Sequence, residues 1–372
     1  MTISTLAFSV GVIATQHSLR GNPCLGVYST VPTTPRPLQA ALGDDGTVVV
    51  LRRSADCTSH SVLIRRTGER PRSLSAPSLA MITAGLVAQG SATNVAGEIQ
   101  KPSIENVVLD GSGDLYVTVA DRFEGAYSGI RRGIFEYSSG SWKSRVVRFV
   151  RIGSDVVPTN ATVGAATSRS VFVANADYGN VNETDLSRLG VDPAYRPPQA
   201  AIASGTTSRS LGTGYVLSAR SAELGGYFAS STERSTPFAR VWNDQRYHVV
   251  GRGIVFAVDT RGVAVGDNRR VTDGIGSPTI WLREISQRLC EGTGTASGIR
   301  GREIVGRLNG EAFVVFDYRE RPKCVRLTSL VPPGWSIGDA YSISGSGAIL
   351  AIGSFRQGPT AWLLLTPRIH SH

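Results

Sequence analysis

Residues 107–117 read VVLDGSGDLYV, with two short apolar segments on either side of a polar turn that contains glycine and aspartate. This pattern predicts a β-hairpin, because β-branched and aromatic residues favour strands while Gly and Asp favour tight turns. Clear copies of the pattern occupy residues 41–50, 256–266 and 341–351, and weaker copies occupy residues 165–174, 216–227 and 298–306. The chain therefore contains a repeat, and we expect each copy to be one unit of a repetitive fold.

Seven such hairpins have turns near residues 46, 113, 169, 221, 262, 302 and 347, at a mean spacing of about 50 residues. A third apolar segment follows nearly every hairpin, and in several units a fourth strand is expected, for example over residues 145–151, 247–250, 287–290 and 324–327. Four strands in each of about seven units are typical of a β-propeller. We therefore predict an all-β fold, a seven-bladed β-propeller formed as one domain by residues 1–372. Six or eight blades, a β-sandwich and a β-helix remain alternatives.

The last unit lacks a fourth strand, because only a short tail follows its third strand. Two apolar segments near the N-terminus, residues 6–14 and 25–28, are available to complete this sheet. Either one would join the two ends of the chain and remove an exposed sheet edge. We expect the N- and C-terminal segments to close the ring in this way.

The three C-terminal units share a more specific form, in which the hairpin carries an apolar-apolar-Gly step and the third strand ends in Trp or Phe. The copies are residues 258–266 with 279–282, 297–306 with 312–316, and 340–353 with 360–364. This form resembles the HAF-type bacterial repeat. The resemblance implies a propeller-like protein, and it assigns no catalytic residue.

The charge balance is compatible with an anionic partner, although solvated surface arginines explain it equally well. The chain has 39 basic and 29 acidic residues, a net charge of +10, and all but three of its basic residues are arginine. Arginine captures carboxylate or phosphate with paired hydrogen bonds, and a basic surface also attracts anionic lipid or nucleic acid. No run of basic residues and no basic helix is visible, so we expect a small molecule or a protein as partner rather than nucleic acid. No apolar run is long enough for a membrane span, and the apolar content excludes an intrinsically disordered chain.

The cysteines and histidines suggest neither a metal nor a cofactor. Cys24, Cys57, Cys290 and Cys324 form no Cys-x-x-Cys pair, and no two histidines have the spacing of zinc ligands. Bridges between Cys24 and Cys57 and between Cys290 and Cys324 would be possible in an oxidising compartment. Buried free thiols are the favoured interpretation, which predicts a cytoplasmic protein, with secretion as the alternative.

Candidate site residues follow from the expected propeller, in which the first strand of each blade lines a central channel. Loops that precede first strands and follow second strands meet at one rim of that channel, where several blades can direct polar groups to one ligand. The candidates for acid–base catalysis are Glu105, His248 and Asp339, since carboxylates and histidine carry protons near neutral pH. The candidates for ligand binding are Asn160, Arg209, Arg252, Tyr341, Asp121 and Asp267.

Two functions are compatible with these residues. The favoured one is a binding propeller that presents its channel rim to a small anionic ligand, a glycan or a protein. Unequal insertions at residues 67–102, 119–132 and 175–199 support it, because recognition loops vary in this way. The alternative is a lyase, hydrolase or cyclase that uses the rim residues. Convergence of Glu105, His248 and Asp339 within about 6 Å would favour the enzyme, and scattered positions would favour binding.

Overall fold

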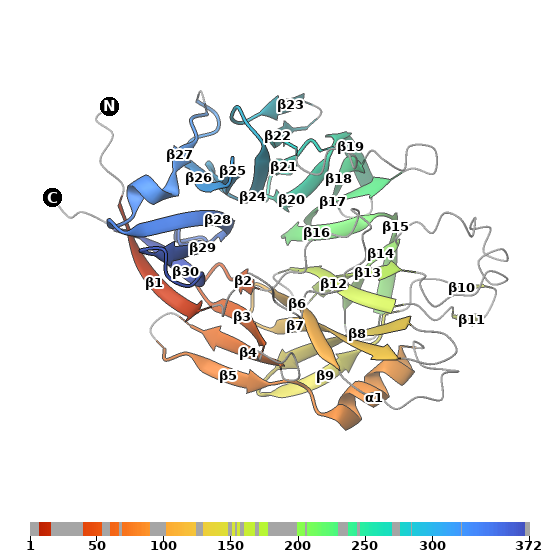
Figure 1. Cartoon of the computed structure of the whole chain (residues 1–372). Coiled ribbons are helices and arrows are strands. Elements are labelled where there is room, and N and C mark those ends of the chain that lie inside the picture. Colours follow the sequence, from red (N-terminus) through yellow and green to blue (C-terminus); the bar gives the residue numbers. More distant parts are fainter. Residues whose placement is uncertain are drawn as a thin grey trace.

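The computed structural model contains seven four-stranded antiparallel sheets. These sheets are arranged in a ring (Figure 1). The structure describes residues 7–15, 40–53, 60–66, 69–89, 102–123, 129–147, 151–152, 155–156, 160–167, 171–177, 199–204, 207–229, 237–243, 246–269, 276–283, 285–320 and 322–368. This architecture confirms the predicted seven-bladed β-propeller.

Each blade runs from an innermost to an outermost strand in chain order, except the last. Blade 1 contains β2 (Ala40–Leu42), β3 (Val48–Arg53), β4 (His60–Arg65) and β5 (Arg72–Ser75), and blade 2 contains β6 (Ser103–Leu109), β7 (Leu115–Phe123), β8 (Gly129–Ser138) and β9 (Ser141–Arg145). Blade 3 contains β12 (Asn160–Ala166), β13 (Val171–Asp177), β14 (Gln199–Ser204) and β15 (Thr207–Thr213), and blade 4 contains β16 (Tyr215–Arg220), β17 (Glu223–Ala229), β18 (Pro237–Asn243) and β19 (Arg246–Arg252).

The C-terminal blades follow the same order. Blade 5 contains β20 (Ile254–Val258), β21 (Ala264–Asp267), β22 (Pro278–Leu282) and β23 (Ile285–Arg288), and blade 6 contains β24 (Gly294–Arg300), β25 (Glu303–Leu308), β26 (Glu311–Val315) and β27 (Val325–Arg326). Blade 7 contains β28 (Trp335–Ile343), β29 (Ile349–Phe355), β30 (Ala361–Arg368) and β1 (Ala7–Thr15). The remaining elements among the described residues are helix α1 (Leu79–Ala88), the 3-10 helix η3 (Leu327–Leu330) and a separate pair, β10 (Arg151–Ile152) and β11 (Asp155–Val156).

Blade 7 closes the ring with strands from both ends of the chain. Strand β1 pairs antiparallel with β30, with Ala7 opposite Arg368 and Thr15 opposite Ala361. The predicted closure is confirmed, with the first of the two proposed N-terminal segments as the outer strand. The second proposed segment, residues 25–28, lies outside the described residues. Because β30 would otherwise present a free edge, this pairing removes a site for edge-to-edge association.

The repeated turn has one hydrogen-bond pattern in four blades. In residues 110–114 the amide of Gly113 donates to the carbonyl of Asp110, and the amide of Asp110 donates to the carbonyl of Asp114. Turns 43–47, 259–263 and 344–348 repeat these two bonds at equivalent positions. Asp110 Oδ1 also accepts from the amides of Ser112 and Asp114, at 2.8 and 2.9 Å. The Asp and Gly of the sequence repeat are therefore local turn residues, the Gly taking a positive φ that other residues rarely adopt.

The apolar-apolar-Gly step of the repeat accommodates a β-bulge in the first strand. In blade 5 the register between β20 and β21 shifts between Val255 and Ala257. A Cβ added at Gly266, on the facing strand, would overlap the carbonyl oxygen of Ile254. The innermost strands of blades 2, 3, 4, 6 and 7 carry comparable register shifts. Glycine is needed at Gly266 because the bulged backbone leaves no room for a side chain.

The hydrophobic core is divided into seven clusters among the described residues, one at each contact between neighbouring blades. The Trp residues of the repeat, Trp242, Trp281 and Trp362, lie on the third strands of blades 4, 5 and 7 and are buried in these clusters. Strand β1 contributes to both sides of blade 7, because Phe8 packs in the cluster shared with blade 6 and Ile13 in the cluster shared with blade 1. A single blade cannot bury both of its faces, so the ring as a whole supplies the core.

The outer strands were the least accurate part of the prediction. The fourth strand expected over residues 145–151 is instead β9, residues 141–145, and the one expected over residues 287–290 is β23, residues 285–288. All four residues of β23 are exposed. An outer strand of this kind has no apolar face to bury, so its sequence shows no apolar alternation. Two of the predicted recognition loops also contain regular structure, since α1 lies within 67–102, and β7 and β8 extend into 119–132.

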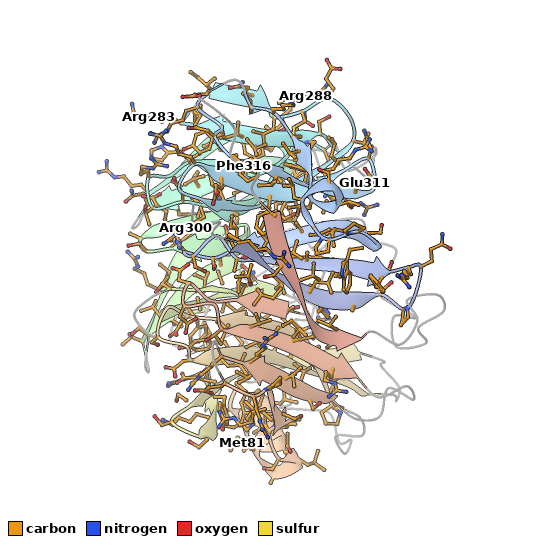
Figure 2. All side chains as sticks on the ribbon, turned by 90° about the vertical axis from the view of Figure 1, so that its left-hand side faces the viewer. Met81, Arg283, Arg288, Arg300, Glu311 and Phe316 are labelled. Carbon is orange, nitrogen blue, oxygen red and sulfur yellow. A yellow bond between two sulfur atoms is a disulfide. The ribbon has the colours of Figure 1, made fainter. Side chains whose placement is uncertain are left out.

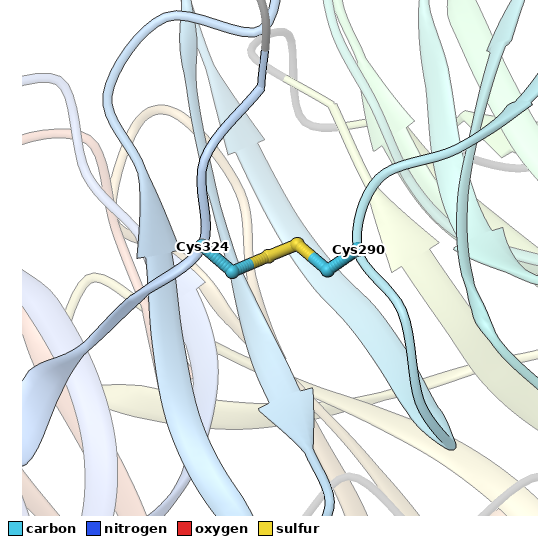
Figure 3. Close-up of a disulfide and its surroundings, with 2 residues drawn as sticks. All are labelled: Cys290 and Cys324. Carbon is cyan, nitrogen blue, oxygen red and sulfur yellow. A yellow bond between two sulfur atoms is a disulfide. The ribbon is translucent and has the colours of Figure 1, made fainter.

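The expectation of free thiols is wrong for one pair of cysteines. Cys290 and Cys324 form a disulfide with a Cα–Cα distance of 6.2 Å (Figure 3). Cys290 follows β23 of blade 5 and Cys324 precedes β27 of blade 6, so the bond links the outer parts of two neighbouring blades. Cys24 and Cys57 lie outside the described residues. None of the helices in the described part of the chain is long and apolar enough to span a membrane.

Candidate functional site

A central channel of about 940 Å³ passes between the innermost strands of all seven blades. Its volume lies within the range of small-molecule sites. Apolar side chains make up much of its wall, among them Leu42, Val107, Leu217, Ile254, Phe256 and Ile343. The charged residues along it are Asp44, Asp110, Arg220, Arg269, Arg300, Arg307 and Asp339. The channel therefore combines an apolar wall with a few charged groups, four of them arginines.

Residues from three blades meet where the first strands end. Arg220 of blade 4 places Nη2 2.6 Å from Asp44 Oδ1 of blade 1, and Arg300 of blade 6 places Nη1 3.6 Å from Asp44 Oδ2. Asp44 and Arg300 are each more than one third exposed. Two guanidinium groups thus share one carboxylate at this mouth of the channel. An arginine has five N–H donors, so both retain donors for a further acceptor.

Asp110 also lines this part of the channel, but its carboxylate belongs to a turn. Its Oδ1 accepts from the side chain of Ser112 as well as from the two turn amides. The residue is almost completely buried, at 3 % exposure. Asp110 is therefore held in place by its own hairpin and is not free to move toward a ligand.

Arg269 lies along the channel with its charge neutralised by a neighbour. Its Nε is 2.8 Å from Asp267 Oδ1 and its Nη2 is 2.5 Å from Asp267 Oδ2, and Thr295 Oγ1 donates to Asp267 at 2.9 Å. Burial by itself would lower the pKa of Arg269, but the hydrogen bonds and charge of Asp267 raise it. Arg307 also lines the channel, and it has no acidic partner within the described part of the chain. Arg307 is thus the lining arginine with the least compensated charge.

Three of the predicted site residues lie at or next to the channel. Asp339 and Tyr341 line it from β28, and the Tyr341 ring packs against Trp362 with centroids 4.9 Å apart. Asp267 is fully buried behind Arg269 and holds that side chain at the wall. These residues come from blades 5 and 7.

The other predicted residues are placed elsewhere. Glu105 is buried in blade 2 and pairs with Arg132 at 2.9 Å, and Asp121 is fully buried at the end of β7. His248 and Arg252 belong to β19, and Arg209 to β15, and all three are exposed on outermost strands. Asn160 begins β12, and its side chain lies outside the described part of the structure. The three catalytic candidates therefore do not converge, because Asp339 lies on an innermost strand of one blade and His248 on the outermost strand of another.

This outcome has a topological reason. His248, Arg209 and Arg252 are close in sequence to the first strand of the next blade, so the sequence by itself predicts positions beside the channel for them. In the structure, the fourth strand forms the outer edge of its blade, and Arg209, His248 and Arg252 are residues of fourth strands. A side chain on the fourth strand consequently stays at the outer surface.

The site residues that were not predicted from the sequence lie beside the turns that connect the first and second strands of a blade. Arg220 and Arg300 are the last residues of their first strands, each paired in register with a glutamate, Glu223 and Glu303 respectively. This repeated Arg–Glu position is visible in the hairpins and could have identified both arginines. Their meeting with Asp44 could not be read from the hairpins, because Asp44 and Arg220 are 176 residues apart. Among the described residues, no group of three or more His, Cys, Asp or Glu side chains is arranged to hold a metal ion.

No protein-family model matches the chain, and no curated protein matches it. The resemblance to the HAF-type repeat stays a prediction. Solved structures with a similar overall arrangement include the Pyrococcus horikoshii acylaminoacyl peptidase, with 7% identity and a TM-score of 0.49, covering 91% of this chain and 53% of that one. The β-propeller domain of the Trilobed protease from Pyrococcus furiosus has 7% identity and a TM-score of 0.35, covering 69% of this chain and 84% of that one.

A Trypanosoma rangeli sialidase has 10% identity and a TM-score of 0.42, covering 90% of this chain and 55% of that one. The chain thus spans about half the length of the acylaminoacyl peptidase and of the sialidase. At these identities and TM-scores the likenesses give no information about activity or ligand.

Proposed function

We propose that the protein is a binding propeller whose central channel takes a small anionic molecule with an apolar body. The observation that carries the proposal is the channel itself, about 940 Å³ in volume, with an apolar wall and the guanidinium groups of Arg220, Arg300 and Arg307 along it. Pockets of this size, with mostly apolar walls and a few polar groups, are typical of small-molecule sites. The arginines match a carboxylate, sulfonate or phosphate.

The mouth formed by Asp44, Arg220 and Arg300 suits an added negative charge. Its two positive charges exceed the one negative charge of Asp44, and the three side chains are ordered by their ion pairs. An anion that binds here meets donors that are already oriented, so less conformational entropy is lost on binding. The apolar body of the ligand would then lie against the channel wall.

The enzyme alternative has less support. Glu105, His248 and Asp339 are carried by three different blades, and only Asp339 is among the residues that line the channel. Scattered positions of this kind favour binding over acid–base catalysis.

The disulfide bears on the compartment in which binding would take place. Disulfides persist in oxidising compartments and are rare in the cytosol. The bond between Cys290 and Cys324 therefore supports secretion rather than the predicted cytoplasmic location.

Isothermal titration calorimetry with naphthalene-2-sulfonate tests the proposal, with the neutral 2-naphthol as matched ligand. We expect one sulfonate site per chain and weaker binding of the naphthol. The double variant Arg220→Gln/Arg300→Gln should bind the sulfonate about tenfold more weakly or worse, since hydrogen bonds to charged groups contribute about 1.5–3 kcal/mol each. Arg288→Gln, on the exposed outer strand β23, is the control and should bind like wild type. Equal affinity for both ligands, or an unaffected double variant, would refute the channel as an anion site.

A further inference from the structure

The central channel carries arginines toward both of its ends. Arg220 and Arg300 lie at one end, where the first strands of blades 4 and 6 finish beside Asp44. Arg307 lies toward the other end, because it is paired with Thr295, near the start of β24. All of these residues except Asp44 are basic or neutral, and all of them line one continuous cavity. A single molecule in the channel can therefore reach both ends at once.

The length of β25 gives the distance between the two ends. Arg300 is paired with Glu303 at one end of β25, and Arg307 lies four residues further along that strand. At about 3.3 Å per residue, the backbone positions of the two arginines are roughly 13 Å apart along the channel. In Figure 2, Arg300 lies toward one face of the ring and Glu311 toward the other. Glu311 begins the next strand, β26, at the end of the blade where Arg307 lies.

The two arginines extend from the same face of blade 6. Successive residues of a strand point to alternate faces, so Glu303, Val305 and Arg307 share one face of β25. Val305 packs in the core cluster that blade 6 shares with blade 7. Arg300 is directly opposite Glu303 and so belongs to the same face. Both guanidinium groups therefore lie on the blade 7 side of blade 6, one toward each end of the channel.

The charge of Arg307 is available to a ligand. Arg307 is half-buried and forms no ion pair with any described residue. Arg269 also lines the cavity, but Asp267 neutralises it at 2.5 Å. Asp339 is the acidic lining residue on blade 7, and the described contacts include no ion pair between Asp339 and Arg307. An acidic group that binds beside Arg307 would therefore supply the charged partner that this side chain lacks.

The wall of the channel suits a rigid apolar body between the two acidic groups. Leu217, Phe256 and Ile343 line the cavity from three different blades. Aromatic and aliphatic side chains of this kind bind apolar surface without requiring hydrogen bonds. A rigid body also keeps two acids at a fixed separation, so it loses less conformational entropy on binding than a flexible chain does.

We infer that the channel is specific for an elongated dianion, a molecule with an acidic group at each end of a rigid apolar body. One acid pairs with Arg220 and Arg300, and the other pairs with Arg307, roughly 13 Å further along the channel. Once the first acid is bound, the second is held close to its own arginine, which raises the overall affinity. This inference rests on the proposed function, because it assigns the chemical class of the ligand for the same channel.

Isothermal titration calorimetry with trans-stilbene-4,4′-dicarboxylate and trans-stilbene-4-carboxylate tests the inference, because the two ligands differ only in the second acid. We expect one dicarboxylate per chain, bound about tenfold more tightly than the monocarboxylate or better. Terephthalate and benzoate form a matched short pair. Terephthalate is too short to reach both ends, so its second acid should bring little gain. The short pair thus separates bridging of the two ends from the general attraction of a dianion to a basic protein.

The variant Arg307→Gln locates the second acid. It should lower the affinity for the dicarboxylate about tenfold and the affinity for the monocarboxylate by much less, since the monocarboxylate keeps the end formed by Arg220 and Arg300. Arg307→Lys retains the positive charge and should bind the dicarboxylate more tightly than Arg307→Gln does. Arg288→Gln, on the exposed outer strand β23, is the control and should bind both ligands like wild type.

The thermal unfolding midpoint of each variant separates loss of binding from loss of fold, and the comparison of ligands on the wild-type protein depends on no variant. Equal affinity for the two stilbenes, or two dicarboxylates per chain, would overturn this inference while the channel remains an anion site. An equal loss of both stilbenes in Arg307→Gln, or as large a gain for terephthalate over benzoate, would do the same. Absence of binding by both stilbenes and by naphthalene-2-sulfonate would overturn the proposed function, and this inference with it.

Discussion

Closure of the ring through β1 can be tested by truncating Phe8. This side chain is 3% exposed and packs against blade 7 in a cluster that also includes Leu363 and Leu365 of β30. Strand β1 is hydrogen-bonded to β30 alone, so it depends on such contacts more than an interior strand does. Replacement of a buried Phe by Ala removes its transfer free energy and leaves a cavity, at a cost of about 3–5 kcal/mol.

Val12→Ala is the matched control for Phe8→Ala, because Val12 lies in the same strand and is 49% exposed. An exposed position of this kind should change stability by about 0.5 kcal/mol or less. Urea denaturation followed by tryptophan fluorescence gives the free energy of unfolding of both variants. The reasoning fails if Phe8→Ala costs no more than Val12→Ala, since β1 would then not be seated in the core.

Three further predictions concern the rest of the ring. Reduction of the Cys290–Cys324 disulfide should lower the free energy of unfolding by about 4 kcal/mol, the chain-entropy estimate for its separation of 34 residues; an unchanged urea midpoint with and without a thiol reductant would contradict this. Gly266→Ala should destabilise the protein by about 2 kcal/mol or more because its Cβ overlaps backbone, whereas Gly338→Ala, with space for a Cβ, should be tolerated in the same thermal unfolding assay. Burial raises the pKa of Glu303, so its charged form is disfavoured in the fold. Glu303→Gln should therefore be more stable than wild type at pH 7, and the difference should disappear as the pH falls below the unfolded pKa of about 4; a stability difference that does not change with pH would contradict this.

The repeat in the sequence was sufficient to predict the seven blades. Each first hairpin depends on local chemistry, namely apolar strands and turns in which residues such as Asp110 bind neighbouring amides. The third strands were also predicted correctly, including the weak segment at residues 200–202, which lies in β14. Their side chains pack between blades, so they carry the apolar pattern that sequence reasoning detects.

Elements at the perimeter were harder to predict. Outer strands such as β23 bury little, and their sequences carry no pattern that distinguishes them from loops. Helix α1 escaped detection because it is apolar on every side and therefore lacks the periodicity of a surface helix. The structure shows that the predicted insertion at residues 67–102 contains this helix, which packs against the core between blades 1 and 2.

The candidate site depends on the tertiary structure more than the strands and turns do. Local sequence alone specified the hairpins and their turns, because those features depend on residues a few positions apart. It also predicted that an N-terminal segment closes the ring, and the structure decided which of the two candidate segments does so. The tertiary structure alone decided which charged groups meet. It brought Asp44 to Arg220 across the channel, and it left His248 on the perimeter although it lies only a few residues from an innermost strand. The physical reason is that residues far apart in the sequence face each other only once the blades are arranged in a closed ring. Their separation along the chain does not determine the distance between them.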